Sequence, residues 1–286
     1  MDQTTIQLAI LDVDGTMVDS PSNRTLSPQL CQTIRQVAES GVRIGLASGR
    51  NYGHIMSQMR TIGFNGPIIS NNGAYVVADG IAIYETLLEP DVIETVIRQA
   101  QELRYMVEFS GRETMYTYIP SGYNGPTFPK EGDTDYLVEL DGTQADFDRM
   151  RKDHISKTTL VVDTREKAEA VTAFWTDGPM SEKATLSSSY WYCLELTAPG
   201  VSKGSALINT AAALGIPMHN VLAIGDGDND AEMLEAAGIS FAMANGSERS
   251  LLAAKYRAPH VKEDGARQVL QRYILRHEPL PSLKTN

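Results

Sequence analysis

The feature of the sequence that most constrains the fold is an alternation of short apolar runs and amphipathic stretches over the first eighty residues. The runs Ile6 to Val13, Val42 to Ala47 and Pro67 to Ser70 are rich in β-forming residues, which predicts buried strands. Amphipathic helices are predicted between them, with glycine stops at Gly41 and Gly63. This βαβαβ order predicts parallel strands joined by right-handed crossovers.

The alternation is interrupted in the middle of the chain and then resumes. From Ser202 onward we predict a helix, a strand over Val221 to Ile224, a short helix and a strand over Ile239 to Met243. Residues 85–198 instead predict the order αββαβαββ, which is typical of an α+β layer. We therefore expect an α/β fold: a doubly wound, mainly parallel, Rossmann-like core from residues 1–84 and 199–286, with an inserted α+β cap domain over residues 85–198.

The composition disfavours several classes of protein. Apolar residues make up 42% and charged residues 21% of the chain, as in globular proteins, and the net charge of −11 disfavours a nucleic-acid platform. Cys31 and Cys193 lack the spacing of a zinc site or a disulfide framework. No signal peptide or membrane-spanning run is found, so we expect a cytoplasmic protein without membrane or nucleic-acid partners. We infer no obligatory protein partner.

An acidic motif, Asp12-Val-Asp14-Gly-Thr16, stands where the first predicted strand ends. Alternation along the strand sends Asp12 and Asp14 to the same side, and such a pair suits Mg²⁺, which prefers oxygen ligands. The Thr16 hydroxyl or amide can contact an anion. A calcium loop is excluded because Met17 and Asn23 occupy its glycine and glutamate positions. A plain turn is the alternative.

A second acidic motif, Gly225 to Asp230, follows another predicted strand. Its aspartates Asp226, Asp228 and Asp230 repel one another unless a cation or solvent compensates. A calcium loop is excluded here too, and a solvated acidic turn is the alternative.

Two further features can bind an anion. Ser48 and Gly49 follow the second predicted strand, where a hydroxyl and backbone N–H groups can hold phosphate oxygens. Lys203 begins a predicted helix whose N-terminal end favours anions. Taken alone, each is more typical of a plain turn or a solvated lysine. Together with the acidic motifs, however, they all fall on one predicted rim of the sheet, and this combination is far more specific than any part.

The motifs Asp-Val-Asp-Gly-Thr, Ala-Ser-Gly-Arg, Ser-Lys-Gly and Gly-Asp-Gly-Asp-Asn-Asp, in this order, resemble the four motifs of haloacid dehalogenase superfamily phosphatases. The stretch Asn71 to Ala74, with the inserted αββαβαββ order, resembles the Cof-type (IIB) subgroup. The resemblance covers the whole chain. One departure is Ala244-Asn245-Gly246, where the subgroup usually carries a Gly-Asn-Ala-like turn.

The resemblance implies a role for each motif residue. Asp12 would be the nucleophile that becomes an aspartyl-phosphate, and Asp14 would be the general acid and base. Mg²⁺ would be held by Asp12, the backbone carbonyl of Asp14, and Asp226. The remaining implied site residues are phosphate or substrate contacts and supporting groups: Ser48, Gly49, Asn72, Lys203 and Asn229 for the former, Thr16 and Asp230 for the latter.

We therefore expect a Mg²⁺-dependent phosphatase of small phosphorylated metabolites, with sugar phosphates as the favoured substrates and the inserted domain conferring specificity. One alternative is a phosphomutase of the same superfamily, which returns the phosphoryl group to the substrate. The other is a non-catalytic sensor of Mg²⁺ and a phospho-ligand. Asp12 and Asp14 argue against the sensor, because binding alone needs neither a nucleophile nor a general acid.

Overall fold

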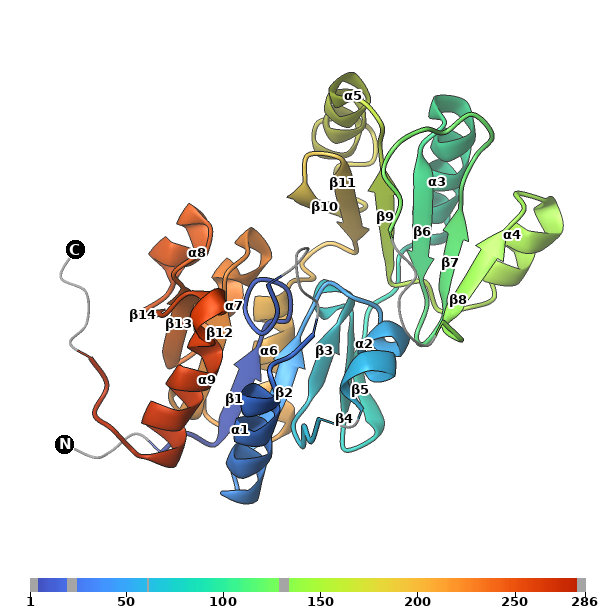
Figure 1. The fold of residues 1–286 in the computed structure, drawn as a ribbon. Helices are drawn as coiled ribbons and strands as arrows, with labels where there is room; N and C mark the ends of the chain where they lie inside the picture. Colours follow the sequence, from blue (N-terminus) through green and yellow to red (C-terminus); the bar gives the residue numbers. More distant parts are fainter. Residues whose placement is uncertain (1–4, 20–24, 61, 129–133, 282–286) are drawn as a thin grey trace. The chain divides into compact units, whose positions relative to one another are not determined.

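An eight-stranded sheet organises the parts of the chain that carry the sequence motifs (Figure 1). The computed structural model describes residues 5–19, 25–60, 62–128 and 134–281. The chain folds into two compact units. The first comprises residues 1–49, 59–84 and 202–286, and the second comprises residues 50–58 and 85–201.

The sheet of the first unit is mainly parallel. Its strand order is β14-β13-β12-β1-β2-β3-β4-β5, and every pair from β14 to β3 is parallel. The strands are β1 (Leu8–Leu11), β2 (Arg43–Ala47), β3 (Ile68–Ser70), β4 (Tyr75–Ala78), β5 (Ile81–Glu85), β12 (Val221–Gly225), β13 (Ile239–Met243) and β14 (Tyr256–Ala258). This order confirms the predicted doubly wound α/β fold.

Helices cover both faces of this sheet because its central strands are apolar on both sides. Leu8 and Ile10 of β1 share a buried cluster with Leu207 of α6 (Lys203–Ala213) and Leu234 of α7 (Ala231–Ala236). The opposite face is covered by α1 (Pro28–Glu39), which contacts β2 and α9 (Gly265–Val269). A π-helical turn (Leu270–Leu275) extends α9, and α8 (Glu248–Ala253) precedes β14.

The second unit contains a six-stranded sheet in the order β10-β11-β9-β6-β7-β8. Its strands are β6 (Met106–Ser110), β7 (Met115–Tyr118), β8 (Leu137–Leu140), β9 (Lys157–Val161), β10 (Thr185–Tyr190) and β11 (Cys193–Thr197). Its helices are α3 (Pro90–Leu103), α4 (Gln144–Met150) and α5 (Arg165–Thr176). Val107, Leu160 and Leu194 line up across three strands and form a buried cluster with Trp175 of α5.

The second unit differs from its predicted order by one strand. β8 pairs parallel with β7, so the order is αβββαβαββ rather than αββαβαββ. β8 has only four residues, with Glu139 exposed and Leu140 buried, and so short a run is weak sequence evidence for a strand. The glycine and proline content of residues 121–135 predicts a loop there, and residues 129–133 of this segment lie outside the described residues.

The short helix α2 (Tyr52–Met59) groups mainly with the second unit, although its residues fall within the range 1–84. Asn51 donates a hydrogen bond from Nδ2 to the carbonyl of Gly111 at 2.8 Å. The ring of His54 stacks on Tyr136, with 5.1 Å between centroids. A Cβ on Gly53 would lie 2.0 Å from the carbonyl oxygen of Glu113, so this approach requires glycine.

Candidate active site

Two aspartates stand at the carboxyl ends of the neighbouring strands β1 and β12. Leu11 is in register with Ile224, so the residues that follow these strands emerge side by side at one edge of the sheet. The N–H of Asp12 donates to the carbonyl of Ile224 at 2.9 Å, which continues the ladder by one step. Asp226 is the residue directly after the last residue of β12, Gly225.

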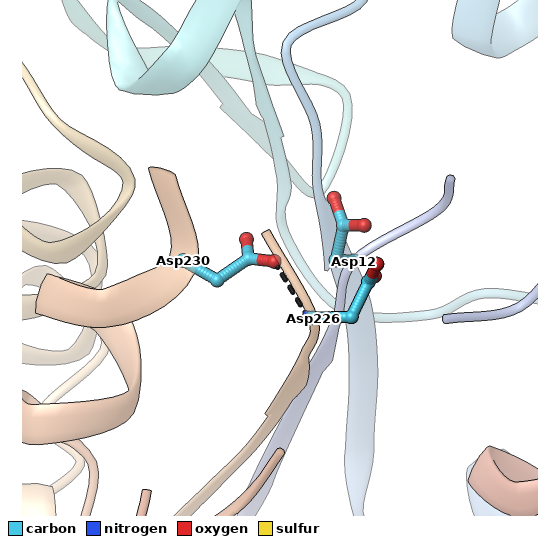
Figure 2. Close-up of side chains that lie close together, drawn as sticks. All are labelled: Asp12, Asp226 and Asp230. Carbon is cyan, nitrogen blue, oxygen red and sulfur yellow. Dashed lines mark hydrogen bonds between the residues drawn. The ribbon is translucent and has the colours of Figure 1, made fainter. Parts of the chain in front are cut away.

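Asp12, Asp226 and Asp230 gather their carboxylates at this edge (Figure 2). One oxygen from each lies within 4.8 Å of the others. Asp12 and Asp230 are buried, whereas Asp228 in the same acidic run is exposed. Burial and the neighbouring Asp230 raise the pKa of Asp12 well above its ordinary value. The same two causes, burial first, raise the pKa of Asp226 to about 7.

Lys203 supplies the positive charge within this cluster. Its Nζ lies 2.6 Å from Oδ1 of Asp12 and 2.6 Å from Oδ1 of Asp230. Burial opposes the charged form, but Asp12 and Asp230 raise the pKa of Lys203 above its ordinary value. The lysine is placed by the start of α6, where Ser202 caps the helix by accepting a hydrogen bond from the N–H of Ser205 at 3.0 Å.

The cluster fits a hard divalent cation. Its donors are carboxylate oxygens, which Mg²⁺ prefers. Among these described residues, one ammonium group beside three carboxylates leaves negative charge uncompensated. Burial, and after it the repulsion from Asp230, raises the pKa of both Asp12 and Asp226. Another cation would relieve this repulsion.

Asp230 acts on its neighbours through both oxygens. Oδ1 accepts from Lys203, and Oδ2 accepts from the N–H groups of Asp226 at 2.9 Å and Gly227 at 2.8 Å. The approach is so close that a Cβ on Gly225 would lie 2.7 Å from that of Asp230. The carboxylate of Asp230 therefore shapes the loop that presents Asp226.

The loop after β1 fits closely against Asp226. Gly15 has φ +85°, and a Cβ there would lie 2.0 Å from Oδ2 of Asp226, so only glycine is accommodated. Thr16 is buried and donates from Oγ1 to Oδ1 of Asp226 at 2.6 Å. Asp14 is half-buried on the same loop.

Hydrogen bonds join Ser48, Asn72 and Asn229 at the same edge of the sheet, and Gly49 directly follows Ser48. The carbonyl of Ser48, which follows β2, accepts from the N–H of Asn72 at 3.1 Å. Asn72 has a left-handed backbone, with φ 55°, and its Oδ1 accepts from Nδ2 of Asn229 at 3.1 Å. Ser48 and Asn72 are buried, and Gly49 and Asn229 are half-buried.

The turn after β13 adds contacts that were not predicted. Asn245 donates from Nδ2 to the carbonyl of Gly15 at 2.8 Å and accepts at Oδ1 from the N–H of Val261 at 2.9 Å. The buried Ser250 donates from Oγ to the carbonyl of Asp226 at 2.8 Å. In the sequence, the position of Asn245 and Ser250 after another predicted strand was the only indication that they lie near the site. The turn that contains Asn245 departs from the pattern expected of the subgroup.

The doubly wound fold and the cluster of carboxylates and lysine at its edge can be compared with known families of hydrolases. A family model described as haloacid dehalogenase-like hydrolase matches residues 9–270, so the chain belongs to this family. The predicted family and enzyme class are therefore confirmed.

Relatives of the chain include phosphatases. Phosphoglycolate phosphatase from Methanoculleus marisnigri is 28% identical over 94% of this chain and 97% of its own length. A 5-amino-6-(5-phospho-D-ribitylamino)uracil phosphatase from Escherichia coli is 28% identical over 96% of this chain and 97% of its own length. A solved haloacid dehalogenase-like hydrolase from B. subtilis shares the fold, with TM-score 0.79 and 23% identity over 93% of this chain and 99% of that chain.

Within the described residues, no helix combines the length and the apolarity that a membrane span requires.

Proposed function

We propose that this protein is a Mg²⁺-dependent phosphatase that hydrolyses small phosphomonoesters, with sugar phosphates as substrates, through an aspartyl-phosphate on Asp12. The observation that carries this proposal is the buried carboxylate of Asp12, 2.6 Å from the ammonium group of Lys203 and beside Asp226. The names of the two curated relatives support a small phosphorylated metabolite as substrate.

Asp12 attacks the phosphorus atom and displaces the alcohol. A carboxylate approaching a phosphate dianion meets strong repulsion, which a nearby cation offsets. Lys203 is the cation in this proposal. Its ammonium group contacts Oδ1 of Asp12, and we assign it a second contact with the oxygens of the incoming phosphoryl group. Burial of both side chains strengthens the electrostatic effect.

Asp14 is the proposed general acid and base. It donates a proton to the leaving alcohol and then accepts a proton from the water that hydrolyses the aspartyl-phosphate. Its half-buried position, on the loop directly after Asp12, leaves it accessible to substrate and water. A proton donor at this position favours a phosphatase over members of the superfamily whose reactions need no general acid there.

The proposed magnesium ligands are carboxylate oxygens of Asp12 and Asp226 and the backbone carbonyl of Asp14. When bound, Mg²⁺ neutralises charge on the phosphoryl group and on the cluster. The hydrogen bond from Thr16 fixes the orientation of the Asp226 carboxylate. Asp230 is assigned a supporting role because its oxygens already accept hydrogen bonds from Lys203 and two backbone N–H groups.

The remaining predicted site residues are assigned to the substrate. Ser48 and Gly49 hold oxygens of the phosphoryl group, and Asn229 assists them. Asn72 contacts the substrate, and its hydrogen bond with Asn229 supports this placement at one edge of the sheet. In the same proposal the inserted residues 85–198 serve as the cap domain that selects among phosphorylated metabolites.

Release of phosphate from p-nitrophenyl phosphate and a panel of sugar phosphates tests the proposal. We expect free phosphate only with Mg²⁺, loss of activity on adding EDTA, and no activity in Asp12→Asn. Phosphate release that continues in EDTA, or in Asp12→Asn at the wild-type rate, would overturn it. An isomerised sugar phosphate without free phosphate would identify a phosphomutase instead.

A further inference from the structure

The backbone of Asp226 forms hydrogen bonds on both sides of the residue. Its N–H donates to Oδ2 of Asp230 at 2.9 Å. Its carbonyl accepts from the N–H of Ser247 at 2.8 Å and from Oγ of Ser250 at 2.8 Å. Because Thr16 contacts the carboxylate, the backbone and the side chain of Asp226 are fixed by different groups.

The two bonds to the Asp226 carbonyl take over where the ladder of the sheet ends. Gly225, the last residue of β12, is in register with Ala242 of β13, and Asp226 lies beyond this pairing. The peptide that joins Asp226 to Gly227 is also held at its other end, because the N–H of Gly227 donates to Oδ2 of Asp230 at 2.8 Å. A trans peptide is planar, so contacts at its carbonyl and at its N–H together fix its orientation.

Ser250 makes the side-chain contact from within α8. It is 0% exposed, and its Oγ lies 2.8 Å from the carbonyl oxygen of Asp226 and 2.9 Å from that of Ser247. A hydroxyl group has one proton, so these two acceptors share it. The contact with Ser247 stays within the first turn of α8, whereas the contact with Asp226 links residues 24 positions apart in the chain. Ser250 therefore joins α8 to the loop that presents the carboxylate of Asp226.

Gly246 leaves the room that this contact needs. A Cβ there would lie 2.7 Å from Oγ of Ser250 and 3.2 Å from the carbonyl oxygen of Asp226. Both distances are shorter than an ordinary van der Waals contact, so a side chain at this position would displace the hydroxyl group from the carbonyl. Gly246 belongs to the turn Ala244-Asn245-Gly246, where the sequence departs from the pattern expected of the subgroup.

The same segment also contacts the other acidic loop of the site. Asn245 donates from Nδ2 to the carbonyl of Gly15 at 2.8 Å. Residues 245–250 therefore contact the loop after β1 and the loop after β12, whose aspartates Asp12 and Asp226 lie close together. Groups behind a metal ligand that fix its orientation raise the affinity for the metal.

We infer that Ser250 is a positioning residue for Asp226 as a magnesium ligand, and that Gly246 makes its contact possible. The inference rests on the proposed function, because it takes Asp226 as a ligand, and it deepens that function by naming what holds the ligand in place. Without the hydroxyl group, Asp226 keeps the hydrogen bond from Ser247 but loses one of the two bonds at its carbonyl. Its carboxylate then samples more orientations, so Mg²⁺ binds more weakly while the reacting groups stay unchanged.

Isothermal titration of the full chain with Mg²⁺ tests the inference. We expect Ser250→Ala to raise the Kd for Mg²⁺ by about 5-fold to 10-fold, as the loss of one hydrogen bond behind a ligand predicts. The Mg²⁺ concentration that gives half-maximal phosphate release from p-nitrophenyl phosphate should rise by the same factor. At saturating Mg²⁺, kcat should stay within about threefold of the wild type, because the variant removes no reacting group.

Gly246→Ala disturbs the same contact by a different route. Its added methyl group obstructs the hydroxyl group of Ser250, so we expect a similar rise in the Kd for Mg²⁺. In the double variant with Ser250→Ala there is no hydroxyl group to displace, so the Kd should stay within about twofold of the Ser250→Ala value. Full multiplication of the two effects, or an unchanged Kd in Gly246→Ala, would refute the role of Gly246.

Ser247→Ala is the matched control for the stability of α8. It removes the Oγ that caps the helix by accepting from the N–H of Ser250, but it keeps the N–H that contacts Asp226. We expect urea unfolding in EDTA to show a loss of stability, and the Kd for Mg²⁺ to stay within about twofold of the wild type. The same rise in Kd in Ser247→Ala as in Ser250→Ala would assign both effects to helix stability and overturn the inference.

A wild-type protein that binds Mg²⁺ and releases phosphate, with an unchanged Kd in Ser250→Ala, would overturn the inference and leave the proposed function standing. A wild-type protein without Mg²⁺ binding, or without Mg²⁺-dependent phosphate release, would instead refute the proposed function, and the inference with it.

Discussion

Nζ of Lys203 lies 2.6 Å from Oδ1 of Asp12, although 191 residues separate them in the chain. Both side chains are buried, and the same ammonium group also contacts Asp230. The start of α6 is thereby joined to the end of β1 and to the short turn Asp228–Asp230 that precedes α7. Stability and the proposed chemistry depend on the same ion pair.

Replacing Lys203 by alanine is expected to reduce both activity and stability. Removing one partner of a buried ion pair leaves charge uncompensated and costs about 3–5 kcal/mol of the free energy of unfolding. Loss of the cation beside the phosphoryl group should lower kcat by roughly 100-fold to 1,000-fold. Urea unfolding and steady-state kinetics measure the two effects, with Lys262→Ala, an exposed lysine, as the control. A Lys203→Ala protein with wild-type kcat would show that the lysine has no part in turnover.

Asp14→Asn separates the proposed roles of the Asp14 side chain and backbone. We expect turnover of sugar phosphates to fall by roughly 100-fold to 10,000-fold, because the general acid is lost. The affinity for Mg²⁺ should stay nearly unchanged, because the proposed ligand is the backbone carbonyl. Isothermal titration with Mg²⁺ measures this directly, and Asp228→Asn, which alters an exposed aspartate, is the control. Loss of Mg²⁺ binding in Asp14→Asn would refute the assignment.

Asn245→Ala tests whether the turn after β13 positions the magnesium site. Asn245 holds the carbonyl of Gly15, which is adjacent to the proposed ligand at Asp14. Loss of about 1 kcal/mol of hydrogen bonding predicts a roughly 5-fold to 10-fold higher Kd for Mg²⁺, with a smaller effect on kcat at saturating Mg²⁺. Asn220→Ala removes a surface hydrogen bond to Gln7 and serves as the control. Equal Mg²⁺ affinity in wild type and Asn245→Ala would assign the asparagine to loop stability alone.

The buried acid Glu108 predicts a pH dependence of stability. Its pKa is about 7 in the folded protein, against an ordinary value of 4.5, so the folded state binds more protons than the unfolded state between these values. Its contribution to stability is therefore greatest below about pH 4.5 and is lost as the pH rises through 7, by up to about 3 kcal/mol. Glu108→Gln should reduce this loss between pH 5 and pH 8 in urea unfolding of the full chain. If the free energy of unfolding changes between pH 5 and pH 8 by the same amount in Glu108→Gln as in the wild type, Glu108 is not the responsible group.

The sequence predicted those parts of the site that depend on the ends of parallel strands. Asp12 and Asp226 lie together because β1 and β12 are neighbours, and the apolar runs that form these strands are visible in the sequence. The contacts of Lys203 with Asp12 and Asp230 depend on how α6 packs, and no local pattern encodes that distance.

The remaining features depend on tertiary contacts. Asn245 reaches Gly15 across 230 residues, and its turn departs from the pattern expected of the subgroup. The strand β8 has only four residues, too few to be recognised alone, and pairing with β7 stabilises it.

The most direct test of the proposed chemistry is to look for a phosphoryl group on Asp12 during turnover. Asp14→Asn should accumulate the intermediate with p-nitrophenyl phosphate, because this good leaving group needs little acid assistance whereas hydrolysis of the intermediate needs the base. After rapid acid quench, peptide mass spectrometry should find the phosphoryl group on Asp12 and on no other residue. Turnover without any phosphorylated Asp12 peptide, or with the phosphoryl group on another side chain, would contradict the proposed mechanism.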